Sequence, residues 1–201
     1  MNSIKGFFGR FFRHPNEEPI KSGAWIQTSS GRKFHIFSPQ DEDIDIDDAA
    51  HALSLLCRFN GHTPEFYSVA QHSIYVSMMC SDENALSGLL HDLPEAYIGD
   101  MATPLKRQMS AFNQVESKIW DAVSTKFGLP KKMAPEIKEA DKKAFRMEWA
   151  YLMGGTNPDG EKFIVSKEEF NKKTPAEVQD EFIKLFHKLV EKHKQFSGIH
   201  V

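Results

Sequence analysis

The sequence predicts a mainly α-helical bundle with one short β-hairpin near its N-terminus. Three observations predict this fold class. Apolar residues recur at helical spacing through most of the chain, proline and glycine fall between these stretches, and β-forming residues gather in one short segment. With 201 residues, of which 40% are hydrophobic and 26% charged, the chain is long enough to bury a core as one domain.

This single domain is expected over residues 23–201, after a tail at 1–22. Its hairpin is expected at about 25–37, because β-forming residues there flank a Ser-Ser-Gly turn. A helical core is expected over about 44–153, and a C-terminal helix over about 175–193.

Local signals set the expected helix starts. Pro64 and Pro135 are expected at first helical positions, because the fixed φ of proline suits the first turn. A further helix is expected to begin at Ser110. Thr174 and Glu177 form a capping box in front of the C-terminal helix. The acidic run at 41–48 lacks the glycine and glutamate of a calcium loop, and we expect it to supply carboxylates to the N-terminus of the next helix.

Composition narrows the function classes. A net charge of -3 and a pI of about 6.3 give no basic field of the kind that indicates nucleic-acid binding. No segment approaches the roughly 20 apolar residues that span a membrane. Cys57 and Cys80 lie in apolar surroundings and are expected as buried thiols, which fits a reducing cytoplasm. The aromatic and basic stretch at 4–13 is expected to be a tail or a strap on the domain, the alternative being contact with a membrane surface or a partner.

Two histidines and two aspartates have the chemistry of a divalent-metal site. His91 and Asp92 are adjacent, so both can turn toward one ion only where the backbone is helical or at a helix end, and Pro94 follows closely. His72 precedes this pair by a length of chain that fits one turn between neighbouring helices. Imidazole nitrogen and carboxylate oxygen together suit Mn, Co, Zn, Fe or Mg.

Asp141 is the fourth candidate ligand. Its helix is expected to bury an apolar stripe on which Asp141 would lie, made up of Ile137, Ala140, Ala144, Phe145 and Trp149. A lone buried carboxylate is costly unless it is paired or binds a metal. A buried salt bridge or a cap for another helix is the alternative to a metal ligand.

Polar residues near these four are candidates for catalysis and phosphate binding. Glu95 and Asp100 are candidate acid–base residues, although each could instead serve a helix terminus. Arg58, His62 and Lys106 are candidate phosphate-binding residues. Arg58 follows a predicted helix, where the helix dipole favours a cation even without a ligand.

At these positions the chain resembles the HD-domain phosphohydrolase superfamily, over roughly residues 44–152. The segments Arg58-Phe59, Ala70–Ser73 and Leu90–Lys106 are similar to the bacterial 5′-deoxynucleotidase branch. They are also similar to related phage enzymes that remove triphosphate from dATP. The resemblance implies an HD-domain helical bundle, to which the hairpin is an addition.

The resemblance also implies roles for individual residues. The residues implied to hold one divalent metal are His72, His91, Asp92 and Asp141. Glu95 falls on the catalytic glutamate, Asp100 on a sugar-contacting aspartate and Arg58 on a substrate-binding arginine. Phe59 stands where the deoxynucleotidases have tryptophan, and with His62 it changes the pocket wall, which leaves base choice and phosphate number open.

The expected function is therefore metal-dependent hydrolysis of a deoxynucleotide, in which an activated water attacks phosphorus. The enzyme would be a dNMP 5′-nucleotidase or a dNTP triphosphohydrolase in the cytoplasm of a bacterial or phage-infected cell. The resemblance implies a homo-oligomer, and neither nucleic acid nor membrane is expected as a partner. The alternatives are a non-catalytic nucleotide-binding or regulatory module, a hydrolase of a signalling nucleotide such as (p)ppGpp, and a purely structural bundle.

Overall fold

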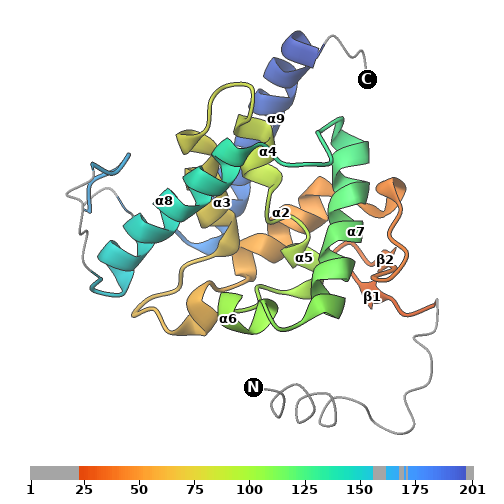
Figure 1. The fold of residues 1–201 in the computed structure, drawn as a ribbon, viewed down its shortest axis with the longest axis horizontal. Helices are drawn as coiled ribbons and strands as arrows, with labels where there is room; N and C mark the ends of the chain where they lie inside the picture. The colour runs from red at the N-terminus through yellow and green to blue at the C-terminus, as the bar shows by residue number, and fades with distance from the viewer. Residues whose placement is uncertain (1–22, 156–161, 168–169, 171, 198–201) are drawn as a thin grey trace, which may run out of the picture.

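A computed structural model describes residues 23–155, 162–167, 170 and 172–197. This part of the chain is mainly helical with a short two-stranded antiparallel hairpin, which confirms the predicted fold class (Figure 1). The tail at 1–22 lies outside the described residues. None of the described helices is both long and apolar enough to cross a membrane.

The hairpin is shorter than predicted, and it packs against the helical bundle. It consists of β1 (Ile26–Gln27) and β2 (Lys33–Phe34), with Ile26 opposite Phe34. The Phe34 side chain is fully buried and stacks on Tyr97, with ring centroids 3.6 Å apart. The hairpin therefore covers one edge of the helical core.

The acidic run forms a helix start, as predicted. A single 3-10 turn, η1 (Asp41–Asp43), leads into α2 (Ile46–Leu55). The Asp45 side chain accepts hydrogen bonds from the backbone N–H groups of Asp47 and Asp48 and so caps α2.

Helix α3 (Val69–Met79) lies at the centre of the molecule and packs against α2, α4, α8 and α9. Every residue from 69 to 77 is buried, as expected for a helix surrounded by other helices. The predicted start at Pro64 is wrong: Ser68 caps the helix, and Phe66 is 46% exposed. The reason is a non-local pairing, because segment 67–69 forms backbone hydrogen bonds with segment 56–58, next to the 3-10 turn η2 (Phe59–Gly61).

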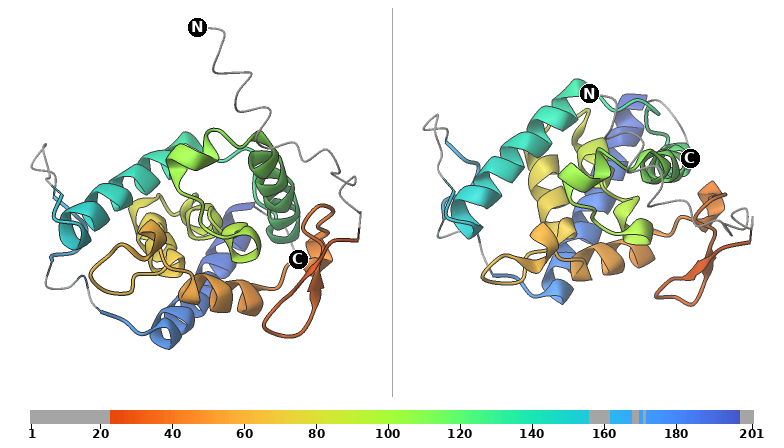
Figure 2. Two further views of the ribbon diagram at one scale, coloured as in Figure 1. Left: turned by 90° about the horizontal axis from the view of Figure 1, so that it is seen from below. Right: turned by 60° about the horizontal axis from the view of Figure 1, so that its bottom comes forward.

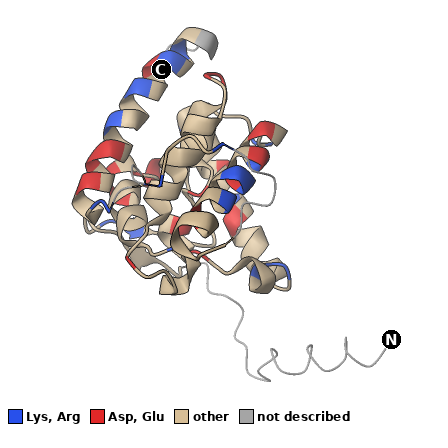
Figure 3. Cartoon of the chain, turned by 90° about the vertical axis from the view of Figure 1, so that its left-hand side faces the viewer, with Lys and Arg blue, Asp and Glu red and all other residues tan. Residues whose placement is uncertain are grey.

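Three of the later helices, α7, α8 and α9, begin where the sequence predicts. Ser110 and Pro135 are first residues of their helices, and Thr174 and Glu177 form the capping box in front of the last one. The helices that follow α3 in the described residues are α4 (Ala85–Leu90), α5 (Glu95–Ile98), α6 (Thr103–Lys106), α7 (Ser110–Phe127), α8 (Pro135–Leu152) and α9 (Pro175–Ser197). Acidic side chains lie in the first turns of α9 and lysines toward its end, which complements the helix dipole (Figure 3).

The helices surround two apolar clusters. Seen from below, α7 and α8 lie on opposite sides with α3, α4 and α5 between them (Figure 2). The larger cluster joins the hairpin and helices α2, α3, α4, α5, α7 and α9, and the smaller one joins α3 to α8. Cys57 and Cys80 are half-buried free thiols.

The buried face of α8 agrees with the prediction as far as Ala144 and differs after it. Phe145 and Trp149 are 38% and 50% exposed, whereas Met147 and Glu148 are fully buried. A shift of one residue turns a helix face by about 100°, because an α-helix has about 3.6 residues per turn. Asp141 therefore lies beside the buried face of α8 rather than within it, with its side chain 42% exposed.

Candidate metal centre

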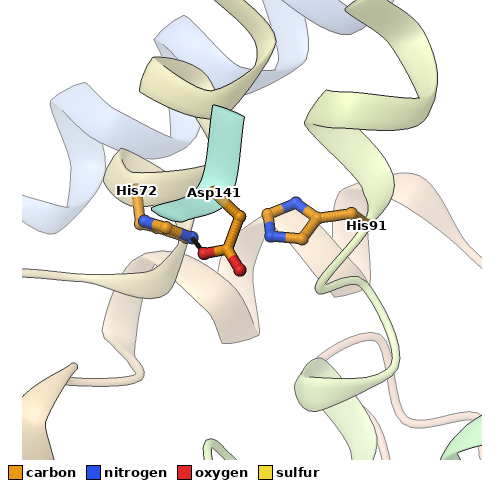
Figure 4. Close-up of side chains that lie close together, drawn as sticks. All are labelled: His72, His91 and Asp141. Atoms are coloured by element: carbon orange, nitrogen blue, oxygen red, sulfur yellow. Dashed lines mark ion pairs between the residues drawn. The ribbon is translucent and has the colours of Figure 1, made fainter. Parts of the chain in front are cut away.

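Three helices bring two imidazoles and a carboxylate to one point (Figure 4). His72 comes from the middle of α3, His91 directly follows α4, and Asp141 comes from α8. One potential ligand atom from each of these side chains lies within 4.8 Å of the other two. The three residues therefore form a group that could hold a metal ion.

Asp92 adjoins the same group. Its Oδ2 lies 3.1 Å from His91 Nε2 and 3.5 Å from His72 Nε2. His72 Nε2 lies 3.2 Å from Asp141 Oδ1. The structure thus brings together all four residues that the sequence singled out as ligands.

The rings of both histidines are held by their other nitrogen. His91 Nδ1 lies 2.8 Å from the backbone carbonyl of Gly88, and His72 Nδ1 lies 2.6 Å from Glu148 Oε1. An Nδ1–H that donates to each oxygen leaves the Nε2 lone pair free. Both Nε2 atoms are buried and make no hydrogen bond of good geometry in the described part of the chain, although each lies 3.1 to 3.2 Å from a carboxylate oxygen. Two imidazole nitrogens that converge with two carboxylates, without good hydrogen-bond geometry between them, fit a divalent cation.

Gly88 permits the close approach of α4 to α3 that this geometry requires. A Cβ at this position would lie 2.8 Å from Cys80 Sγ and 3.3 Å from Ser77 Cα. The Gly88 carbonyl also fixes the His91 ring. A residue without a side chain is therefore needed three positions before the histidine.

The electrostatics of the cluster favour a cation. Burial and the Arg58 cation oppose charge on His72, but the carboxylates of Glu148 and Asp141 outweigh them and raise its pKa to about 9. Burial opposes ionisation of Asp92 and Asp141 as well, yet the neighbouring imidazoles hold the pKa of both carboxyls below the usual range. The same negative field that retains a proton on His72 would attract a metal ion.

Glu95 lies in the first turn of α5 and is only 6% exposed. Its Oε2 is buried with no hydrogen-bond partner among the described residues. Burial, together with the negative charges of Asp92 and Asp100, raises the Glu95 pKa to about 10. Asp100 follows Gly99, whose φ of +82° ends α5, and burial raises its pKa also, with Arg58 opposing the shift.

Arg58 supplies a nearly buried positive charge at the edge of the cluster. Its side chain is 12% exposed, with Nη1 3.8 Å from Asp92 Oδ2 and Nε 3.2 Å from Glu148 Oε2. Burial opposes its charge, but Glu148 and Asp92 raise the Arg58 pKa further above its already high value. The guanidinium is therefore positioned beside the candidate metal ligands.

The other candidate substrate-binding residues, unlike Arg58, have no described contact with the candidate metal ligands. Lys106 Nζ is 2.5 Å from Glu116 Oε1, and it affects Glu95 only as a neighbouring charge. His62 is exposed at the end of η2. Phe59 has a φ of +54°, which is strained for an aromatic residue, and its ring stacks on Phe145 with centroids 5.8 Å apart.

Sequence reasoning missed two residues of the site, Glu148 and Tyr67. Glu148 contacts both His72 and Arg58, and the Tyr67 hydroxyl donates to Glu148 Oε1 at 3.0 Å. A signal for Glu148 was present, since it follows Ala144 by four residues and therefore shares the face of α8 that packs on α3. Tyr67 precedes α3 and carries no comparable signal.

A helical bundle with a candidate metal centre is the class of protein that this fold and site define. No protein family model matches the chain. The uncharacterized protein YfdR of Escherichia coli is 42% identical over 118 residues, which cover 59% of this chain and 66% of that protein, just under two thirds. An uncharacterized protein of Rhodobacter capsulatus is 37% identical over 131 residues, covering 60% of this chain and 67% of that protein. The chain belongs to the same family as the Rhodobacter protein.

Proposed function

We propose that this protein is a metal-dependent phosphohydrolase of the HD-domain type that acts on deoxynucleotides. The observation that carries the proposal is the convergence of the buried Nε2 atoms of His72 and His91, which make no hydrogen bond of good geometry, with the Asp141 carboxylate. The Asp92 carboxylate supplies a fourth ligand in this proposal. Mn, Co, Zn, Fe and Mg all suit this donor set.

A divalent cation at this centre would supply a water of lowered pKa and polarise a phosphoryl oxygen. The residues of the chain supply the rest. Arg58 offers guanidinium hydrogens to the phosphoryl oxygens at the edge of the cluster, where burial strengthens its effect. Glu95, whose raised pKa favours the protonated acid, exchanges a proton with the attacking water or the leaving oxygen.

The resemblance of segment 90–106 to deoxynucleotidases supports the substrate class, with Asp100 facing the sugar. The proposal implies residence in the cytoplasm of a bacterial or phage-infected cell, where such nucleotides are found. The number of phosphates released depends on which phosphorus lies over the metal, and Phe59 and His62 belong to the pocket wall that would decide it.

A product assay tests this proposal. Purified protein with Mn²⁺ or Co²⁺ is given a panel of dNMPs, dNTPs and ppGpp, and the products are resolved by chromatography. Free phosphate from dNMPs identifies a 5′-nucleotidase, and intact triphosphate from dNTPs identifies a triphosphohydrolase. Turnover of ppGpp alone would favour the signalling-nucleotide alternative. Absence of turnover by folded, metal-loaded protein would overturn the hydrolase and favour a binding module.

A further inference from the structure

We infer that Glu148 is a positioning residue whose single buried carboxylate fixes the orientation of both the His72 ring and the Arg58 guanidinium. His72 belongs to the metal end of the site and Arg58 to its phosphate end. The role of Arg58 rests on the proposed function. The effect of Glu148 on metal binding can be measured without any turnover.

The contacts of Glu148 use both oxygens of its carboxylate. Oε1 lies 2.6 Å from His72 Nδ1 and accepts a hydrogen bond from the Tyr67 hydroxyl at 3.0 Å. Oε2 accepts from Arg58 Nε at 3.2 Å. Glu148 and His72 are both 0% exposed. Three donors from two other segments of the chain thus converge on a carboxylate that water does not reach.

These contacts have a consequence for the metal. A carboxylate that accepts from the Nδ1–H of a histidine fixes the ring and increases the basicity of the opposite nitrogen. His72 Nε2 is that opposite nitrogen, and it faces Asp141 and Asp92. Glu148 therefore aims the His72 lone pair into the centre.

The same carboxylate orients the arginine. Glu148 engages Arg58 through Nε, so the Nη1 end of the guanidinium is turned toward Asp92, 3.8 Å away. A guanidinium is planar, so fixing Nε also fixes the plane of its remaining donors. Loss of the Glu148 charge would leave Arg58 without its main buried counter-charge.

Calorimetric titration of Mn²⁺ into the metal-free wild type and into metal-free Glu148→Gln tests this inference. We expect Mn²⁺ to bind about 10- to 100-fold more weakly than to the wild type, the usual effect of losing the carboxylate partner of a metal-binding histidine. In the product assay we expect the same variant to raise the KM for the deoxynucleotide, because Arg58 loses its orientation.

The control is Glu136→Gln, the same exchange on the same helix. Glu136, in the first turn of α8, accepts hydrogen bonds from Ser81 and Asn84, and its described contacts include none of the four candidate ligands. We expect it to lower the thermal midpoint without changing the Mn²⁺ affinity. Tyr67→Phe removes one hydrogen-bond donor to Glu148 and keeps the Glu148 charge. We expect its Mn²⁺ affinity to fall by less than about 10-fold, a smaller loss than in Glu148→Gln.

A second measurement uses the wild type alone and needs no folded variant. Long-range ¹H–¹⁵N spectra of the Zn²⁺-loaded protein report which nitrogen of His72 carries a proton. The inference predicts a proton on Nδ1, and a proton on Nε2 would overturn it. Equal Mn²⁺ affinity of wild type and folded Glu148→Gln would overturn the inference alone, whereas a wild type that binds no Mn²⁺ would overturn the proposed function with it.

Discussion

Asp48 and Glu95 are two buried carboxylates at the starts of neighbouring helices, and their surroundings are opposite. Asp48, in the first turn of α2, accepts hydrogen bonds from the hydroxyls of Ser29 and Ser30 and from the Ser30 backbone, at 2.6 to 2.7 Å. Glu95, in the first turn of α5, has a buried oxygen with no described partner. Burial opposes ionisation of both, but the serine donors lower the Asp48 pKa to about 2, whereas like charges help raise the Glu95 pKa to about 10.

This difference separates a structural carboxylate from the one to which we assign proton transfer in the proposed function. The groups that donate to Asp48 lie in the hairpin turn, so the Asp48 carboxylate links the hairpin to α2 through hydrogen bonds. A buried polar atom without a partner costs stability, and such atoms gather at functional sites. Five buried side-chain atoms of the described residues make no hydrogen bond of good geometry. Those of Glu95, His72 and His91 lie at the candidate metal centre, which supports a functional role for that region, and the other two belong to Ser73 and Tyr97.

Glu95→Gln should give the largest effect on activity. The amide keeps the shape of the protonated acid and removes its proton transfer, so we expect kcat to fall by about 10²- to 10⁴-fold in the product assay. Because a raised pKa disfavours the folded state above the ordinary value of 4.5, the variant should be at least as stable as the wild type at pH 7. Unchanged kcat would remove Glu95 from the mechanism.

Two truncations on α8 test which face of this helix is buried. Met147→Ala empties a fully buried position and should cost about 2–5 kcal/mol of unfolding free energy. Phe145→Ala removes a larger side chain that is 38% exposed and should cost clearly less than Met147→Ala. Urea denaturation measures both values, and the reverse order would restore the face that the sequence predicted.

Asp48→Asn should destabilise the protein without affecting the metal centre. A carboxylate that accepts hydrogen bonds contributes about 1.5–3 kcal/mol per charged interaction, and asparagine retains part of this. We therefore expect a loss of about 1–3 kcal/mol in urea denaturation, with unchanged Mn²⁺ affinity. A loss of Mn²⁺ binding would show that the two regions are not separate.

Protonation of Asp48 should contribute to the pH dependence of the unfolding free energy. Its folded-state pKa of about 2 lies below the ordinary 3.8, so its contribution is complete above pH 3.8 and declines as the pH falls toward 2. In Asp48→Asn this part of the acid-induced loss should be missing, and the unfolding free energies of the two proteins should converge at low pH. Parallel curves between pH 5 and pH 2 would contradict the assigned pKa.

Local patterns in the sequence were enough to predict the helices from Ser110, Pro135 and Thr174, because caps and proline act within one turn. The start of α3 was not predictable in this way, because backbone pairing between distant segments holds residues 67–69 extended. Glu148 was missed for a related reason. Which stripe of an amphipathic helix is buried depends on its neighbours, and a choice one residue away placed Trp149 inside and Glu148 outside.

The candidate metal ligands can be predicted from the sequence more easily than the groups that hydrogen-bond to them. His72, His91, Asp92 and Asp141 are residue types that bind metals, and adjacent histidine and aspartate in a helical segment are typical of a metal site. Tyr67 and the Gly88 carbonyl act through hydrogen bonds that only the folded chain creates.

Calorimetric titration of Mn²⁺ into the metal-free wild type and into Asp141→Ala tests the central claim most directly. We predict saturable binding of one ion per chain to the wild type and affinity at least about 100-fold weaker in the variant, since a direct ligand should matter no less than its hydrogen-bonded support. The thermal midpoint of the metal-free variant should stay close to that of the wild type, because the Asp141 side chain is 42% exposed. Equal binding by both proteins, or no binding by the wild type, would contradict the metal centre.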